Sequence, residues 1–164
     1  MLPLEDALAQ MLHQLPFPTK TETLALTEAA DRVCAEDVIS PINVPSFDNS
    51  AMDGYAVRLA DLQQSMTLSV AGKSFAGNPF QGEWVAQSAV RIMTGAMIPE
   101  GADAVVMQEE VTVNEDGTVT FATLPKANQN IRRIGEDVKK GDVVLHQGLS
   151  LIHISEPTRL QLIS

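Results

Sequence analysis

The chain has 164 residues, of which 45% are hydrophobic, and a formal net charge of −10. This length suits one domain of ordinary size, so two domains would each have only a small core. The negative charge argues against nonspecific binding to nucleic acid, because neutralising phosphates requires a basic surface. The lone cysteine, Cys34, cannot form an intramolecular disulfide, and no apolar run reaches the ~18 residues of a membrane span. We therefore expect a soluble cytoplasmic protein with no nucleic-acid or membrane partner.

The chain is predicted to begin with an amphipathic helix behind Pro3. Its apolar residues recur at helical spacing, at Leu4, Leu8, Met11, Leu12 and Leu15,. Pro16 and Pro18 are expected to end this helix, because proline lacks the backbone donor that a helix needs. The next expected elements are a strand over 21–26, a short helix over 27–32 and a strand over 35–39.

Strand-like periodicity begins after Pro41 and Pro45 and continues along the rest of the chain,. Strands are expected over 54–58, 67–71, 89–93 and 104–108. A hairpin is expected from 111–113 and 118–121, with Asp116 and Gly117 in its turn. In this hairpin the apolar side chains of Val111, Val113, Val119 and Phe121 are predicted to share one face.

A cluster of polar side chains lies immediately before the strand at 54–58. The segment 47–57 contains two carboxylates, an amide, a hydroxyl and a glycine. Such groups can form a ligand site, but they are also ordinary turn residues that bond to nearby backbone groups. Composition alone leaves both interpretations open.

The order of these residues is more specific than their composition. The run PxFDNSAMDGYA, from Pro45 to Ala56, resembles residue for residue the N-terminal motif of the MoeA/gephyrin family of molybdopterin molybdenumtransferases. Further segments that resemble this family follow in the family's order, at 70–77, 91–96, 99–109 and 130–137. The resemblance covers the chain from Leu4 to about Gly148.

The resemblance implies a mainly β fold with some α-helix. A β-rich, barrel-like module over 46–137 would be inserted into a small, elongated α/β domain formed by 1–45 and 138–148. The chain would return to this domain near Asp137, with a strand over 142–145 as its first element. The family's later α/β domain, which binds pterin and nucleotide, and its small C-terminal β domain would not be in this chain. The active cleft would lie between the β-rich module and the α/β domain of a partner subunit.

The resemblance also implies an activity in molybdenum cofactor biosynthesis. Enzymes of the family insert molybdate into adenylylated molybdopterin and release AMP, with a divalent metal such as Mg²⁺. Family members form homodimers and can contact other proteins of the cofactor pathway. An N-terminal portion is expected to be inactive alone, and the alternative is a non-catalytic dimerisation or scaffolding module.

The expected catalytic residues are Asp53, Thr94 and Asp137, which match family active-site positions. The Asp53 carboxylate would hold Mg²⁺ or orient molybdate, and the alternative is an aspartate that bonds the following backbone amides. The Thr94 hydroxyl and the neighbouring amides would face an anionic ligand, whereas Thr94 and Gly95 without the resemblance would be read as a turn.

Residues expected to bind the cofactor lie in two segments. Arg132 and Arg133 form an adjacent basic pair that suits phosphate or molybdate, and the alternative is a salt bridge to Glu136 or Asp137. Asp137 would bind metal or anchor Arg132. The other segment contains Asn49 and Ser50, for which a role in shaping the loop is the alternative.

The end of the chain departs from the family pattern. Residues 149–159 match the translation of a transposase-type sequencing adapter, so 149–164 is expected to be a non-native tail. His153 would then be no metal ligand. The alternative is a natural variable tail.

Overall fold

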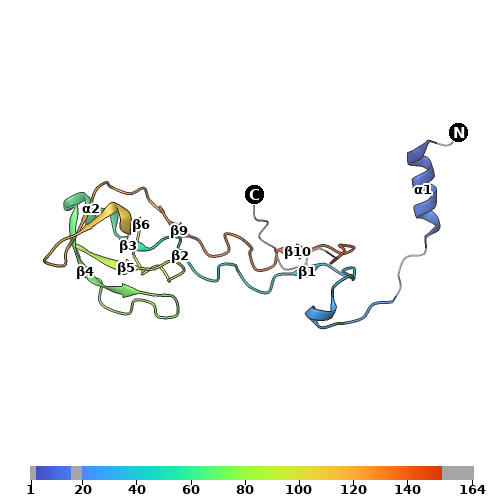
Figure 1. The fold of residues 1–164 in the computed structure, drawn as a ribbon, viewed down its shortest axis with the longest axis horizontal. Coiled ribbons are helices and arrows are strands. Elements are labelled where there is room, and N and C mark those ends of the chain that lie inside the picture. Colours follow the sequence, from blue (N-terminus) through green and yellow to red (C-terminus); the bar gives the residue numbers. More distant parts are fainter. Residues whose placement is uncertain (1–2, 16–19, 153–164) are drawn as a thin grey trace, which may run out of the picture. The chain divides into compact units, whose positions relative to one another are not determined.

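The computed structural model describes residues 3–15 and 20–152 (Figure 1). The chain divides into two compact units, one formed by Met1–Val38 with Leu145–Ser164 and the other by Ile39–Val144. The predicted division into 1–45 with 138–148, 46–137 and 149–164 stays a prediction. Pro16, Pro18 and His153 lie outside the described residues.

The unit Ile39–Val144 contains a curled, six-stranded sheet (Figure 1). Its strands run in the order β6 (Ala104–Met107), β3 (Gly54–Val57), β5 (Ser88–Ile92), β4 (Thr67–Ser74), β8 (Val119–Phe121) and β7 (Val111–Val113). The β4–β5 pair is parallel and the other neighbours are antiparallel. The prediction of a mainly β fold with some α-helix is confirmed.

Strand β3 is buried on both faces because its side chains alternate between two hydrophobic clusters,. Tyr55 and Val57 belong to one cluster, while Ala56 belongs to the other, together with Ile92. At Gly54 the backbone of β6 approaches so closely that a Cβ atom would lie 1.9 Å from the Val106 carbonyl oxygen. Only glycine fits this position without separating the two strands.

A two-residue strand, β2 (Asn49–Ser50), is held on both sides. It pairs with β9 (Ile131–Arg132), so that Ser50 is opposite Ile131. On its other side the Ser50 amide donates to the Ala96 carbonyl at 3.0 Å, and the Gly95 amide donates to the Ser50 carbonyl at 2.8 Å. The segment that precedes Asp53 is therefore fixed by backbone hydrogen bonds.

The expected hairpin is confirmed, since Val111 is opposite Phe121 and Val113 is opposite Val119 in β7 and β8. Helix α2 (Leu59–Gln64) and the 3₁₀ turn η2 (Gln108–Glu110) were not predicted. Helix α2 buries Leu62, and the carboxylate of Asp103 accepts a hydrogen bond from the Leu59 amide at 2.8 Å.

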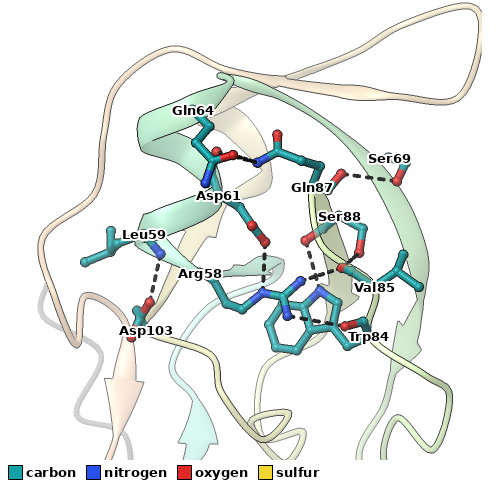
Figure 2. A network of polar contacts seen from close by, with 10 residues as sticks. All are labelled: Arg58, Leu59, Asp61, Gln64, Ser69, Trp84, Val85, Gln87, Ser88 and Asp103. Atoms are coloured by element: carbon teal, nitrogen blue, oxygen red, sulfur yellow. Dashed lines mark hydrogen bonds and ion pairs between the residues drawn. The ribbon is translucent and has the colours of Figure 1, made fainter.

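A polar network around Arg58 fixes the connection between β4 and β5 (Figure 2). The Arg58 guanidinium lies 4.6 Å from the ring centroid of Trp84 and donates to the carbonyls of Trp84 and Val85. Its Nε donates to Asp61 Oδ2 at 2.8 Å. The indole N–H of Trp84 donates to the Ser88 carbonyl at 2.9 Å.

The two ends of this unit run side by side. The Val44 amide donates to the Val138 carbonyl at 2.7 Å, the Gly141 amide to Ser40 at 2.9 Å, and the Ser40 amide to Asp142 at 2.9 Å. Strands β1 (Val38–Ile39) and β10 (Val143–Leu145) continue this pairing as a two-stranded sheet. The strand expected over 142–145 is thus confirmed, and the one expected over 35–39 begins only at Val38.

Helix α1 (Leu4–Gln14) confirms the predicted amphipathic helix, and none of its residues is buried. The strand expected over 21–26 is wrong, because residues 20–25 form no ladder with another segment, and Leu26 is 87% exposed. The expected helix over 27–32 is reduced to the 3₁₀ turn η1 (Leu26–Glu28). Among the described residues no helix is long and apolar enough to cross a membrane.

Residues 148–151 pair with residues 32–34. The Cys34 amide donates to the Leu149 carbonyl at 2.9 Å, and the Leu151 amide donates to the Arg32 carbonyl at 2.8 Å. These contacts do not bear on the origin of the segment 149–164, so the non-native tail stays a prediction.

Candidate active site

The structure brings Asp53 and Thr94 together. Asp53 immediately precedes β3, and Thr94 follows β5 by two residues. Because Gly54 is opposite Ile92 in the β3–β5 ladder, the two segments leave the sheet side by side. Asp53 Oδ1 accepts hydrogen bonds from the Thr94 amide and from Thr94 Oγ1, both at 2.7 Å. Asp53 therefore bonds across the sheet end, and not to its own following amides as the alternative supposed.

These hydrogen bonds set the charge of the pair. The hydrogen bond from the Thr94 hydroxyl and then the one from the Thr94 amide lower the pKa of Asp53. Burial opposes them with a smaller effect, and the positive charge of Arg91 adds a still smaller lowering. Asp53 is thus an anion at neutral pH and can only accept hydrogen bonds or bind a cation. The Thr94 hydroxyl donates its proton to Asp53, so its oxygen is left as an acceptor.

The amides of the turn after β5 are all used within the protein. The Thr94 amide bonds to Asp53, the Gly95 amide to the Ser50 carbonyl at 2.8 Å, and the Ala96 amide to the Met93 carbonyl at 3.0 Å. These amides already have acceptors within the protein, and the expectation that they and the Thr94 hydroxyl face an anionic ligand stays a prediction. The pair of Asp53 and Thr94 presents acceptors, which suit a cation or a ligand that carries N–H or O–H groups.

Two further residues surround this pair and were missed by the sequence analysis. Arg91 donates from Nη1 to the Gly54 carbonyl at 2.7 Å, and from Nη2 to Gln108 Oε1. The backbone N–H of Gln108 donates to the Asp53 carbonyl at 3.0 Å. The available signal was Arg91 itself, a single charged residue inside the apolar run over 89–93.

Arg132 and Asp137 form a second pair. Arg132 Nη2 donates to both carboxylate oxygens of Asp137, and its Nε lies 3.8 Å from Glu136 Oε1. The hydrogen bond and charge of Asp137 raise the pKa of Arg132. The salt bridges named as the alternative for Arg132 are thus present. In residues 3–15 and 20–152, no hydrogen bond or ion pair joins this pair directly to Asp53 and Thr94.

Arg133 is used differently from its neighbour. Its guanidinium donates to Asp48 Oδ2 and to Asn128 Oδ1, while the Ile134 amide donates to Asp48 Oδ1 at 2.7 Å. The hydrogen bond from the Ile134 amide, followed by the hydrogen bond and the charge of Arg133, lowers the pKa of Asp48, although burial opposes them. This arrangement ties the start of the 47–57 segment to the chain after β9.

Replacement Asp48→Asn should destabilise the protein at pH 7 by about 1 kcal/mol, because a charge-assisted hydrogen bond at a partly exposed site is lost. The folded-state pKa lies below the ordinary value of 3.8. The contribution of Asp48 is therefore present above about pH 4 and is lost as the pH falls through the folded-state pKa. Thermal unfolding of both proteins between pH 7 and pH 2.5 tests this, and parallel melting curves across that range would contradict it.

Asn49 and Ser50 are buried and make local hydrogen bonds. Ser50 Oγ donates to the Met52 carbonyl at 2.6 Å and accepts from the Met52 amide at 3.3 Å. Asn49 Nδ2 donates to the Phe47 carbonyl at 3.4 Å. These contacts fit the role in shaping the loop, and cofactor binding by these two side chains stays a prediction.

No group of three or more His, Cys, Asp or Glu side chains in the described part of the chain is arranged to hold a metal ion. Asp53 offers one carboxylate, with Oδ1 engaged by Thr94. Mg²⁺ commonly binds through one or two carboxylates and completes its octahedron with water and substrate phosphates. The donor set at Asp53 fits that mode, and it does not fit a site made of protein ligands alone.

A cavity of about 530 Å³ lies in the unit formed by Met1–Val38 with Leu145–Ser164. It is lined by residues that include Val33, Cys34 and Gly148, and by none of the predicted site residues. We therefore assign the candidate site to Asp53 and Thr94, on their geometry.

Three comparisons relate the chain to known proteins. Residues 2–155 match the family model described as MoeA N-terminal region (domain I and II). Over 157 residues the chain is 78% identical to the molybdopterin molybdenumtransferase of Haemophilus influenzae, covering 96% of this chain and 39% of that protein. The enzyme of the same name from Bacillus subtilis is 38% identical over 155 residues, covering 90% of this chain and 36% of the relative.

A solved structure has a similar fold. The crystal structure of the molybdopterin biosynthesis moeA protein from Pyrococcus horikoshii OT3 matches with a TM-score of 0.72 at 38% identity, over 90% of this chain and 39% of that one. The chain thus spans about two-fifths of the length of the curated relatives that it matches.

Proposed function

Because this chain belongs to the MoeA N-terminal family, we propose that it forms part of a molybdopterin molybdenumtransferase that acts in molybdenum cofactor biosynthesis. The names of the relatives support this assignment. In the proposed reaction, molybdate enters adenylylated molybdopterin and AMP is released. The observation that carries the proposal is the hydrogen-bonded pair of Asp53 and Thr94 at the end of β3 and β5.

We assign Asp53 the role of holding a divalent cation, with Mg²⁺ as the expected ion. When bound, Mg²⁺ would neutralise negative oxygens of the substrates and polarise them. Thr94 fixes the orientation of the Asp53 carboxylate through two hydrogen bonds and so leaves the other carboxylate oxygen, Oδ2, as the ligand. Direct contact between Asp53 and molybdate is disfavoured, because both are negatively charged and neither has a proton to share.

An anionic part of the substrate would instead contact Arg132. Its Nη2 and Nε are engaged by Asp137 and Glu136, while in the described part of the chain Nη1 has no partner. Arg133 is a weaker candidate, since it uses both terminal nitrogens on Asp48 and Asn128. Asp137 then acts as the anchor that orients Arg132.

The length of the relatives implies that the complete enzyme contains further parts. We expect the 164-residue chain alone to show no molybdate insertion, because it contains at most one wall of the cleft. The measurement is conversion of adenylylated molybdopterin and molybdate to molybdenum cofactor and AMP, with a protein extended to the length of the relatives as the positive control. Turnover by the 164-residue chain would contradict the expectation, and an inactive extended protein would contradict the proposed function. The homodimer and the scaffolding alternative stay predictions.

A further inference from the structure

Arg91 has an unusual place at the end of the sheet. It lies in β5 opposite Tyr55 of β3, and its guanidinium carbon is 5.1 Å from the centroid of the Tyr55 ring. Nη1 donates to the carbonyls of Gly54 at 2.7 Å and Ile92 at 3.3 Å, and Nη2 donates to Gln108 Oε1. One planar side chain thus contacts the start of β3, the end of β5 and the residue after β6.

These three contacts surround the backbone that carries the candidate site. Gly54 directly follows Asp53, and Ile92 precedes Thr94 by two residues. The backbone N–H of Gln108 also donates a hydrogen bond to the Asp53 carbonyl at 3.0 Å. The distance between the Asp53 carboxylate and the Thr94 amide therefore depends on two backbone segments that Arg91 connects. No hydrogen bond in the described part of the chain joins Arg91 to the Asp53 side chain itself.

We propose that Arg91, oriented by Gln108, is a positioning residue that sets the Asp53–Thr94 pair in its productive geometry. A guanidinium suits this role, because its donors form a rigid planar fork that one ammonium group cannot reproduce. Its contacts with main-chain carbonyls fix backbone, and the Tyr55 ring fixes the plane of the fork. The importance of that geometry for catalysis rests on the proposed function, but the positioning itself does not.

The chain contains a matched comparison in Arg58. This residue also lies over an aromatic ring, Trp84, and also donates to two backbone carbonyls of the same unit (Figure 2). Its own carboxylate partner is Asp61, and it follows the end of β3 that is opposite to Asp53. If replacing an arginine acts only by loosening the packing of this unit, the Arg58 and Arg91 variants should have similar effects on the Asp53–Thr94 hydrogen bonds. If Arg91 positions this pair, only the Arg91 variant should weaken them.

The test compares Arg91→Lys and Arg58→Lys in the 164-residue chain by amide hydrogen exchange, followed residue by residue with NMR. In Arg91→Lys the exchange of the Thr94 amide should become about tenfold faster relative to the Ala56 amide within β3, because its hydrogen bond to Asp53 is weakened. Arg58→Lys should leave this ratio unchanged. Gln108→Ala, which keeps the arginine, should give a smaller change in the same direction.

A second arm uses the protein extended to the length of its relatives. Arg91→Lys should lower kcat by about a hundredfold with a small change in KM, since a displacement of about 1 Å can have that effect. An unchanged Thr94 ratio in both Arg91→Lys and Gln108→Ala would overturn the proposal, as would an equal change in Arg58→Lys. If the extended wild-type protein is inactive, the proposed function fails, while the exchange data still decide whether Arg91 positions the pair. If Arg91→Lys does not fold, Gln108→Ala decides it.

Discussion

Replacement Asp53→Asn in the protein extended to the length of its relatives should lower the rate of molybdate insertion by at least about a hundredfold. Mutating a residue that only orients a metal ligand can already cost that much activity, and Asp53 is proposed to bind the metal directly. The asparagine oxygen can still accept from the Thr94 amide and hydroxyl. What is lost is the negative charge at the position where the cation would bind. The partly exposed site should tolerate this change with little effect on the melting temperature.

The hairpin supplies a matched control for this variant. Asp116 Oδ1 also accepts from the amide and the hydroxyl of a threonine, Thr118, at 2.9 and 2.6 Å. The Thr118 hydroxyl and then its amide lower the pKa of Asp116, as Thr94 does for Asp53. Asp116→Asn therefore removes the same kind of carboxylate from a turn outside the candidate site.

The measurements are the rate of cofactor formation, its dependence on Mg²⁺ concentration, and the melting temperature of both variants. Asp53→Asn should require more Mg²⁺ and turn over slowly, while Asp116→Asn should match the wild type in rate. Two variants that lose activity and stability to the same extent would favour a structural role for Asp53.

The largest loss of stability is expected from Gly54→Ala. A Cβ atom at this position would lie 1.9 Å from the Val106 carbonyl oxygen and 2.8 Å from the Val106 carbonyl carbon. Both atoms are backbone in the neighbouring strand, so the clash is relieved only if β3 and β6 separate. We expect destabilisation by about 3 kcal/mol or more, at the upper end of the range for overpacked sites.

Urea unfolding monitored by the fluorescence of Trp84, the only tryptophan of the chain, measures this effect. Gly72→Ala is the control, because its Cβ would approach the Phe80 ring at 2.6 Å and this side chain can rotate away. The control should lose less than about 1.5 kcal/mol. A Gly54→Ala protein within 1 kcal/mol of the wild type would show that the two strands are less tightly apposed than described.

The fold could be predicted from the sequence where periodicity and burial agree. The family prediction is confirmed. The strands expected over 54–58, 67–71, 89–93 and 104–108 are confirmed as β3, β4, β5 and β6, and the expected hairpin is confirmed as β7 and β8. Of these, β3 is buried throughout and β5 and β6 are buried at all but one residue each. Strands β2 and β9 could not be found in this way. Each has only two residues, and the two strands pair with each other although they lie about 80 residues apart in the sequence. The strand expected over 21–26 was wrong because alternation alone does not supply a partner strand.

The candidate site was predicted as separate residues and not as pairs. The resemblance singled out Asp53, Thr94, Arg132 and Asp137, but neither it nor the spacing indicated that Thr94 would use both its donors on Asp53. That contact depends on the register of β3 and β5, which the sequence does not fix. Arg91 was missed because strand patterns describe apolar positions, and they give no partner to the charged residue between them.

The two ends of the unit Ile39–Val144 are hydrogen-bonded to each other, which bears on how such a unit can be inserted into another domain during evolution. Because Ser40 bonds to Gly141 and Asp142, and Val44 to Val138, the points where the chain enters and leaves are neighbours. An insertion whose ends are adjacent can occupy a loop of a host domain without separating the host's own strands. We therefore expect that the unit can be produced without its flanking segments, or placed in a loop of another protein, with Asp53 and Thr94 still in place.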